Sequence, residues 1–169
     1  MKSTEVISDA FGRIRDLVHR TVDGLTPEQL AFRPDGEANS IGWLAWHLTR
    51  IQDDHVAGVA GDAQAWTSGG WADRFDVPFD PTDTGYGHNP EDVAAFAVES
   101  AQLLLDYYDA VHGRTMAYLQ GLSDDDLDRV VDANWDPPVT LGVRLVSVIG
   151  DDWQHIGQAA FIRGLAERA

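Results

Sequence analysis

The chain has 169 residues, of which 44% are hydrophobic and 24% charged, a balance typical of one globular domain spanning residues 1–169. Its formal net charge of −16 opposes binding to nucleic acids and anionic membranes, and no apolar run reaches the ~20 residues of a membrane helix. Because cysteine is absent, any metal must be held by His, Asp or Glu. The N-terminus lacks a signal-peptide pattern, so we expect a cytoplasmic protein.

The first part of the chain predicts two long helices. Residues 3–24 place apolar side chains at three- and four-residue spacing, as amphipathic helices do. A short capped turn follows at residues 25–30, where Thr26 is the N-cap and Pro27 takes the first helical position. The second helix begins after Asn39 or Ser40 and runs to about residue 59.

A long loop over residues 60–89 separates these helices from the next, and loops of that length are usually functional or mobile. A third helix is predicted from residue 90 to 119, capped by Asn89. Residues 123–127 form another capped turn, and two prolines within residues 130–139 exclude helix there. A fourth helix, capped by Thr140, reaches about residue 165. Four long helices with long second and third connections predict an all-α four-helix bundle, and no strand pattern competes.

The fourth helix carries a carboxylate and an imidazole at metal-binding spacing. Asp151 and His155 stand one turn apart, with Cβ atoms about 6 Å from each other. His47 lies in an apolar stretch of the second helix, where an imidazole requires a partner. A lone His on an apolar face is more often a hydrogen-bonded core residue. However, three such groups on two helices favour a metal site with one open position.

Two neighbouring residues leave alternatives open. Asp152 competes with Asp151, because an acid on an apolar helix face is costly unless it is paired or bound to a cation. His55 is either a group that supports the ligands or a core histidine. His88, in the long loop, could close over the site, although a solvated loop role is the simpler interpretation. The predicted buried face of the fourth helix comprises Leu145, Ile149, Trp153, Ile156 and Ala160.

The two motifs together resemble the DinB-like superfamily. The residues that carry the resemblance are Ser40-Ile41-Gly42-Trp43-Leu44-Ala45-Trp46-His47-Leu48 and His155-Ile156-Gly157-Gln158, and it covers nearly the whole chain. It implies a four-helix bundle that holds a divalent metal, commonly zinc or nickel, through three side chains. The superfamily pattern has one His on the second helix and His-x-x-x-His-x-Gly-Gln on the fourth, with Glu as the first residue in an isomerase branch. Carried over to this sequence, the superfamily pattern implies that the metal ligands are His47, Asp151 and His155. Asp151 departs from the pattern, since relatives have His or Glu there.

The resemblance also implies a class of reaction. The superfamily includes mycothiol-dependent maleylpyruvate isomerases and S-transferases that use mycothiol or bacillithiol. We therefore expect a metal-dependent transferase that joins a low-molecular-weight thiol, such as mycothiol, to a small electrophile. An arginine-biased composition suits a GC-rich actinobacterial genome. Arg50 or Arg144 could pair with a carboxylate of cofactor or substrate, or simply lie on the surface.

Two other functions fit the same residues. The first is hydrolysis by metal-bound water, with a nearby carboxylate such as Asp152 as the base. The second is a non-enzymatic bundle, with or without metal, that forms a homodimer through an apolar helix face. A thiol-dependent reaction separates the transferase from the hydrolase, and metal content separates both from a metal-free bundle.

Overall fold

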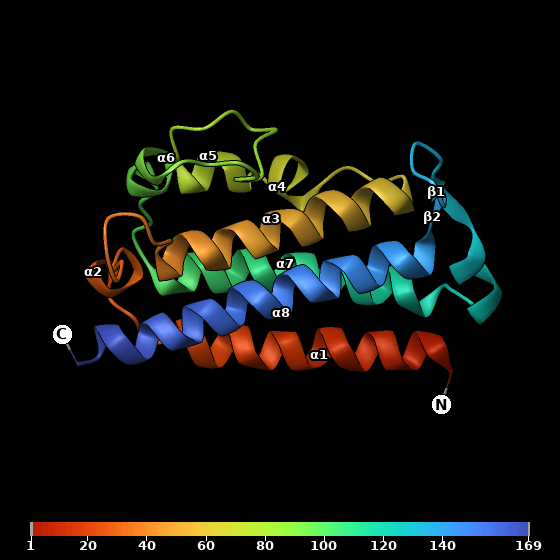
Figure 1. Cartoon of the computed structure of the whole chain (residues 1–169), viewed down its shortest axis with the longest axis horizontal. Coiled ribbons are helices and arrows are strands. Elements are labelled where there is room, and N and C mark those ends of the chain that lie inside the picture. The colour runs from red at the N-terminus through yellow and green to blue at the C-terminus, as the bar shows by residue number, and fades with distance from the viewer. Residues whose placement is uncertain (1, 169) are drawn as a thin grey trace.

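Four long helices dominate the computed structural model, which describes residues 2–168. They are α1 (Ser3–Val22), α3 (Ile41–Ala60), α7 (Ala101–Gln120) and α8 (Leu141–Ala166). Figure 1 shows them lying side by side, with α3 and α8 running in opposite directions. The contact between α3 and α8 is the most extensive between any two elements of the described chain. This mostly helical structure confirms the all-α prediction.

Side chains cap the helices at the positions where the chain turns into them. The hydroxyl of Ser40 accepts a hydrogen bond from the Trp43 amide at the start of α3, and Thr140 caps α8 through the Val143 amide. The short α2 (Pro27–Leu30) has a capping box formed by Thr26 and Gln29. Each cap satisfies amides that have no partner inside the helix, which explains why these starts were predictable.

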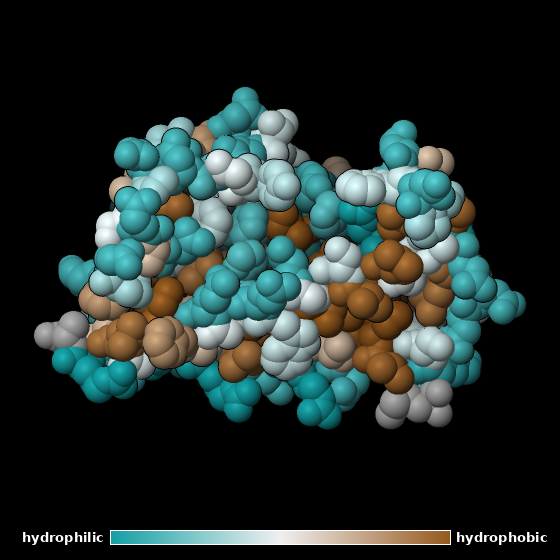
Figure 2. Space-filling model, in the orientation of Figure 1, coloured by the Kyte–Doolittle hydropathy of each residue, from teal (hydrophilic) through white to brown (hydrophobic). Residues whose placement is uncertain are grey.

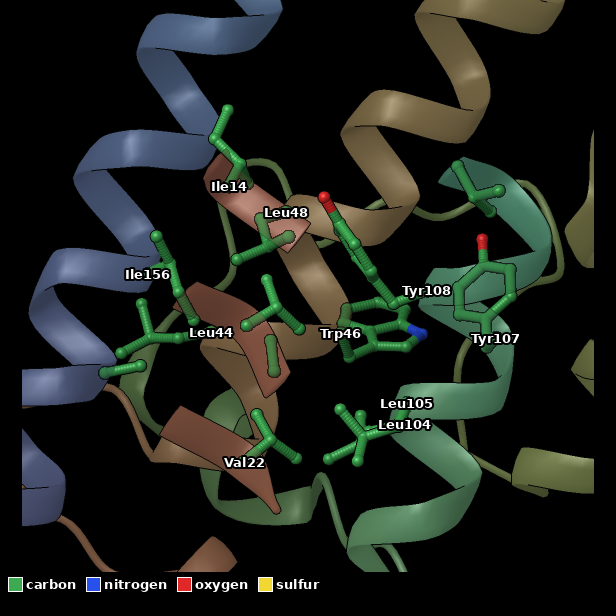
Figure 3. Packing of buried hydrophobic residues seen from close by; sticks show 14 of the residues in the cluster. Ile14, Val22, Leu44, Trp46, Leu48, Leu104, Leu105, Tyr107, Tyr108 and Ile156 are labelled. Atoms are coloured by element: carbon green, nitrogen blue, oxygen red, sulfur yellow. The ribbon is translucent and has the colours of Figure 1, made fainter. Parts of the chain in front are cut away.

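The core lies where the four long helices meet. Figure 3 shows Ile14 and Val22 of α1, Leu44 and Leu48 of α3 and Ile156 of α8 turned toward one another. All five are buried. None of the helices within residues 2–168 combines the length and the apolar character needed to cross a membrane.

The predicted third helix is divided into α6 (Pro90–Ala95) and α7. Phe96 follows α6 in extended backbone, and its ring lies 5.3 Å from that of Trp46 on α3, measured between centroids. Ser100 then caps α7 by accepting from the Leu103 amide. The helical periodicity was correct, but the break at residues 96–100 lets Phe96 and Val98 enter the core.

The long loop contains two short helices, α4 (Ala65–Ser68) and α5 (Trp71–Phe75), which lie over α3 in Figure 1. Trp66 and Phe75 are buried, and both rings pack against Tyr107 of α7. Residues 60–89 are therefore a packed layer on the long helices.

Before α8, a 3₁₀ helix, η1 (Asp124–Asp128), leads into a small antiparallel hairpin of β1 (Val130–Asp132) and β2 (Val139–Thr140). No strand was predicted in this region. Strands of three and two residues are too short to show the alternation by which strands are recognised in a sequence.

The buried face of α8 is rotated from the predicted one. Leu145 and Ile156 are buried as expected, but Asp152 is also in the core and Trp153 is 40% exposed. The outer face of α8 is apolar too, with exposed side chains at Val143, Val146 and Phe161. Figure 2 shows hydrophobic side chains gathered on this side of the molecule. Because both faces are apolar, hydrophobicity alone could not identify the inner one.

Candidate metal centre

His47, Asp151 and His155 converge between α3 and α8. Each offers one ligand atom, and these three atoms all lie within 4.8 Å of one another. The two imidazole rings are 4.9 Å apart between centroids, and Asp151 Oδ1 lies 3.5 Å from His155 Nε2. The packing of α3 on α8 brings the histidines together, and the one-turn spacing on α8 adds the carboxylate.

Hydrogen bonds orient both imidazoles. His47 Nδ1 lies 2.6 Å from the Thr84 carbonyl oxygen, and His155 Nδ1 lies 3.0 Å from Gln158 Oε1. Both oxygens only accept hydrogen bonds, so each Nδ1 donates and each Nε2 keeps a free lone pair. This is the arrangement in which histidine binds a metal through Nε2 while its other nitrogen is held by a partner.

Residues of the long loop fix the position of His47. Gly85 has φ +86°, and a Cβ there would lie 2.9 Å from His47 Nδ1 and 3.0 Å from the Trp43 ring. Only glycine allows the loop to approach so closely with this backbone. The Trp43 ring stacks on His47 at 4.6 Å between centroids. Thr84 and Gly85 were not predicted as site residues, because nothing in the sequence marks which residues of a loop meet a distant helix.

His88 also belongs to this packing. Its side chain is 7% exposed, its Nε2 lies 2.9 Å from Asp83 Oδ2, and Trp43 Nε1 donates to its Nδ1 at 3.1 Å. The simpler interpretation, a solvated loop residue, is therefore wrong. These contacts hold the loop against α3. The Trp43 ring packs against both His88 and His47.

The two histidines differ in proton affinity. Burial lowers the pKa of His47. Burial also acts to lower the pKa of His155, but the hydrogen bonds that its protonated ring makes to Asp151 and Gln158 outweigh burial and raise that pKa. Asp151 keeps one buried carboxylate oxygen, Oδ2, with no hydrogen-bond partner among the described residues. Two imidazole nitrogens and a carboxylate with an unpartnered oxygen are a donor set that fits a divalent cation such as zinc.

Asp152 points elsewhere. It is fully buried on the core side of α8, and within residues 2–168 neither of its carboxylate oxygens has a hydrogen-bond partner. Burial, together with the nearby charge of Asp151, raises the pKa of Asp152 well above its usual range. Its atoms are not part of the cluster that could hold a metal. The structure therefore separates the two neighbouring acids into one beside the histidines and one in the core.

Arg50 is engaged inside the protein. It is fully buried and donates to Gln64 Oε1 at 2.8 Å and to the Asp83 carbonyl at 3.1 Å. It also lies 3.8 Å from Asp53 and over the ring of Trp66. With these partners, Arg50 is not available to a ligand. Arg144 and His55, in contrast, line a cavity near the β1–β2 hairpin.

The comparison with known proteins decides the family. The family model of the DinB superfamily matches residues 10–159. The chain belongs to the DinB superfamily. A crystal structure of a conserved protein of a locus from Enterococcus faecalis is 34% identical, with a TM-score of 0.90 over 100% of this chain and 99% of that one. No curated protein matches this DinB-superfamily chain.

Proposed function

We propose that this DinB-superfamily protein is a cytoplasmic, metal-dependent transferase that uses a low-molecular-weight thiol, such as mycothiol, and a small electrophile. The observation that supports the proposal is the convergence of His47, Asp151 and His155 between α3 and α8. Because the chain has no cysteine, it has no thiol of its own. A thiol that reacts at this site must therefore be supplied by a cofactor.

Each residue of the site has a defined part in this proposal. His47 and His155 would hold a zinc or nickel ion through Nε2, and Asp151 would hold it through its carboxylate. Thr84 and Gln158 hold the rings so that these lone pairs face one another. A divalent ion with three protein ligands has an open position, where its charge would lower the pKa of a bound thiol and favour thiolate.

The hydrolytic alternative has less support. It requires a base beside the metal, and Asp152, the carboxylate considered for that task, is fully buried in the core. A base must come within hydrogen-bond reach of the water that it activates. Within residues 2–168, the cluster around the histidines contains one carboxylate, Asp151, and the proposal uses it as a metal ligand.

The proposal is tested by metal content and by thiol dependence. Protein purified without a His-tag should contain about one divalent ion per chain, and His155→Ala should lose it, because three ligands are the usual minimum for such a site. Conjugation of a thiol to 1-chloro-2,4-dinitrobenzene should then require both the ion and the thiol. Metal-free protein with full activity would contradict the proposal, and hydrolysis without thiol would favour the alternative.

A further inference from the structure

A second group of polar side chains lies on the same two helices, α3 and α8, nearer the β1–β2 hairpin. His55 is eight residues after His47 on α3, and Arg144 is seven residues before Asp151 on α8. Because the helices are antiparallel, both displacements lead toward the hairpin end of the bundle (Figure 1). At 1.5 Å per residue, the second group lies roughly 10 Å along the helix axes from the metal cluster.

These side chains line an open cavity of about 600 Å³. α3 contributes Asp54 and His55, the segment from η1 to β1 contributes Arg129 and Asp132, and α8 contributes Arg144. The C-terminal end of α3 and the N-terminal end of α8 meet there, so their opposite helix dipoles offset each other. The binding preference of the cavity therefore depends on its side chains.

The two carboxylates of the cavity are already engaged. Asp132 Oδ1 accepts from the backbone and side-chain nitrogens of Asn134, each at 3.0 Å, and its Oδ2 accepts from Arg144 at 3.2 Å. Asp54 Oδ1 accepts from Gln64 at 2.6 Å. These bonds tie both acids to the chain and reduce their capacity to accept from a ligand.

The donors of the cavity are used much less. Arg144 Nη1 lies 3.4 Å from His55 Nδ1, and Asp54 Oδ2 lies 3.7 Å from the same nitrogen. Burial and the charge of Arg144 lower the pKa of His55, in agreement with a neutral ring. The Arg129 guanidinium donates only to the Tyr118 hydroxyl and the Val59 carbonyl, and no ion pair joins it to an acid within residues 2–168.

The unused hydrogen-bonding groups of the cavity are therefore mostly donors. Each guanidinium has five N–H groups, and the contacts described leave several of them unused on both arginines. An acceptor-rich anionic group satisfies them, and a planar carboxylate matches the fork of a guanidinium. The cavity thus brings two arginines with unused donors and an imidazole beside two acids that are already engaged.

We propose that this cavity is a carboxylate subsite, in which Arg144 and Arg129 anchor one end of a ligand whose reactive end lies at the metal cluster. The second half of this statement rests on the proposed function, whereas carboxylate binding by the cavity does not. The carboxylate belongs either to the thiol or to the electrophile. Arg144 is the residue that positions the carboxylate, because it lines the cavity from α8 and contacts both His55 and Asp132.

The first test needs no metal. Metal-free protein is titrated with glutarate while the His55 ring is followed by NMR. We expect a saturable shift whose dissociation constant rises at least tenfold in Arg144→Gln. Arg13→Gln is the matched control, since it removes the same charge at an exposed residue outside this cavity. No saturable shift, or equal weakening by both variants, would overturn the subsite. Arg129→Gln provides a second variant that leaves α8 unchanged.

The second test identifies which ligand carries the carboxylate. Protein loaded with cobalt(II) is titrated with ω-mercapto acids and with alkanethiols of equal length, and the sulfur-to-cobalt absorption band is measured. If the thiol carries the carboxylate, mercapto acids that span roughly 10 Å bind at least tenfold more tightly than alkanethiols, and Arg144→Gln removes the difference. If mercapto acids and alkanethiols bind equally while glutarate gives a saturable shift, the carboxylate belongs to the electrophile. Absence of any band contradicts the proposed thiol chemistry, while the glutarate result still decides the subsite.

Discussion

Two polar clusters occupy neighbouring turns of α3, and they differ in how completely their atoms are partnered. Around Arg50 and Asp53, the guanidinium has four hydrogen-bond partners, and the carboxylate accepts from two backbone amides and from Tyr107. Around His47, one ring nitrogen of each histidine and a carboxylate oxygen of Asp151 lie within 4.8 Å of one another, and Asp151 Oδ2 has no hydrogen-bond partner among the described residues. A buried cluster whose bonds are complete supports the fold, whereas one with converging unused lone pairs indicates a ligand.

The largest loss of stability is expected in the Arg50–Asp53 cluster, whose hydrogen bonds are complete. Asp53→Ala leaves the Arg50 charge buried without its acid and removes the acceptor for the α4 amides, so unfolding free energy should fall by about 3–5 kcal/mol. Asp54→Ala, at the next and more exposed residue, should cost less than about 1 kcal/mol. Urea denaturation of both variants measures the difference. Equal stabilities would contradict a structural role for the Arg50–Asp53 cluster.

In the cluster of His47, Asp151 and His155, substitution should affect metal binding more than folding. Asp151→Ala removes a direct ligand, so its zinc affinity should fall by more than the 10- to 100-fold typical of an outer partner. Asp152→Ala should keep most of the metal, because that carboxylate faces the core. Competition with a zinc chelator measures both affinities. The reverse order would show that Asp152 is the ligand.

A smaller loss is expected when only the support of a ligand is removed. Gln158→Ala deletes the oxygen that holds His155 Nδ1, and the zinc affinity should fall by about tenfold while the fold is retained. Gln154→Ala is the matched control, because Gln154 is an exposed glutamine on the same helix with no such contact. The same chelator competition applies. If both variants bind zinc equally, Gln158 does not orient His155.

Local signals in the sequence were sufficient for most of the helices. Ser40 and Thr140 mark helix starts because their side chains cap amides within the same turn, and Asp151 and His155 are neighbours because helical spacing dictates it. These features depend on residues three or four positions apart. The four long helices could therefore be predicted from the sequence, apart from the break before α7, and so could the neighbourhood of Asp151 and His155.

What the sequence could not provide depends on distant contacts. Thr84 meets His47, and Phe96 leaves its helix to reach Trp46, across separations of 37 and 50 residues. The inner face of α8 was ambiguous for another reason, since an acid, Asp152, replaces an apolar residue inside while Trp153 lies outside. Tertiary packing overrides local hydrophobicity at such positions.

The smallest expected effect separates the two histidines within the cluster. In metal-free protein, burial should make His47 titrate below the usual histidine pKa, and hydrogen bonding to Asp151 and Gln158 should make His155 titrate above it. Only neutral imidazole binds a metal, so as the pH falls protons compete first at His155, and zinc affinity begins to decline through its raised pKa. NMR titration of both rings measures this order, and Gln158→Ala should lower the pKa of His155 with little change at His47. A His155 that titrates below His47 would contradict the hydrogen bonding that distinguishes the two ligands.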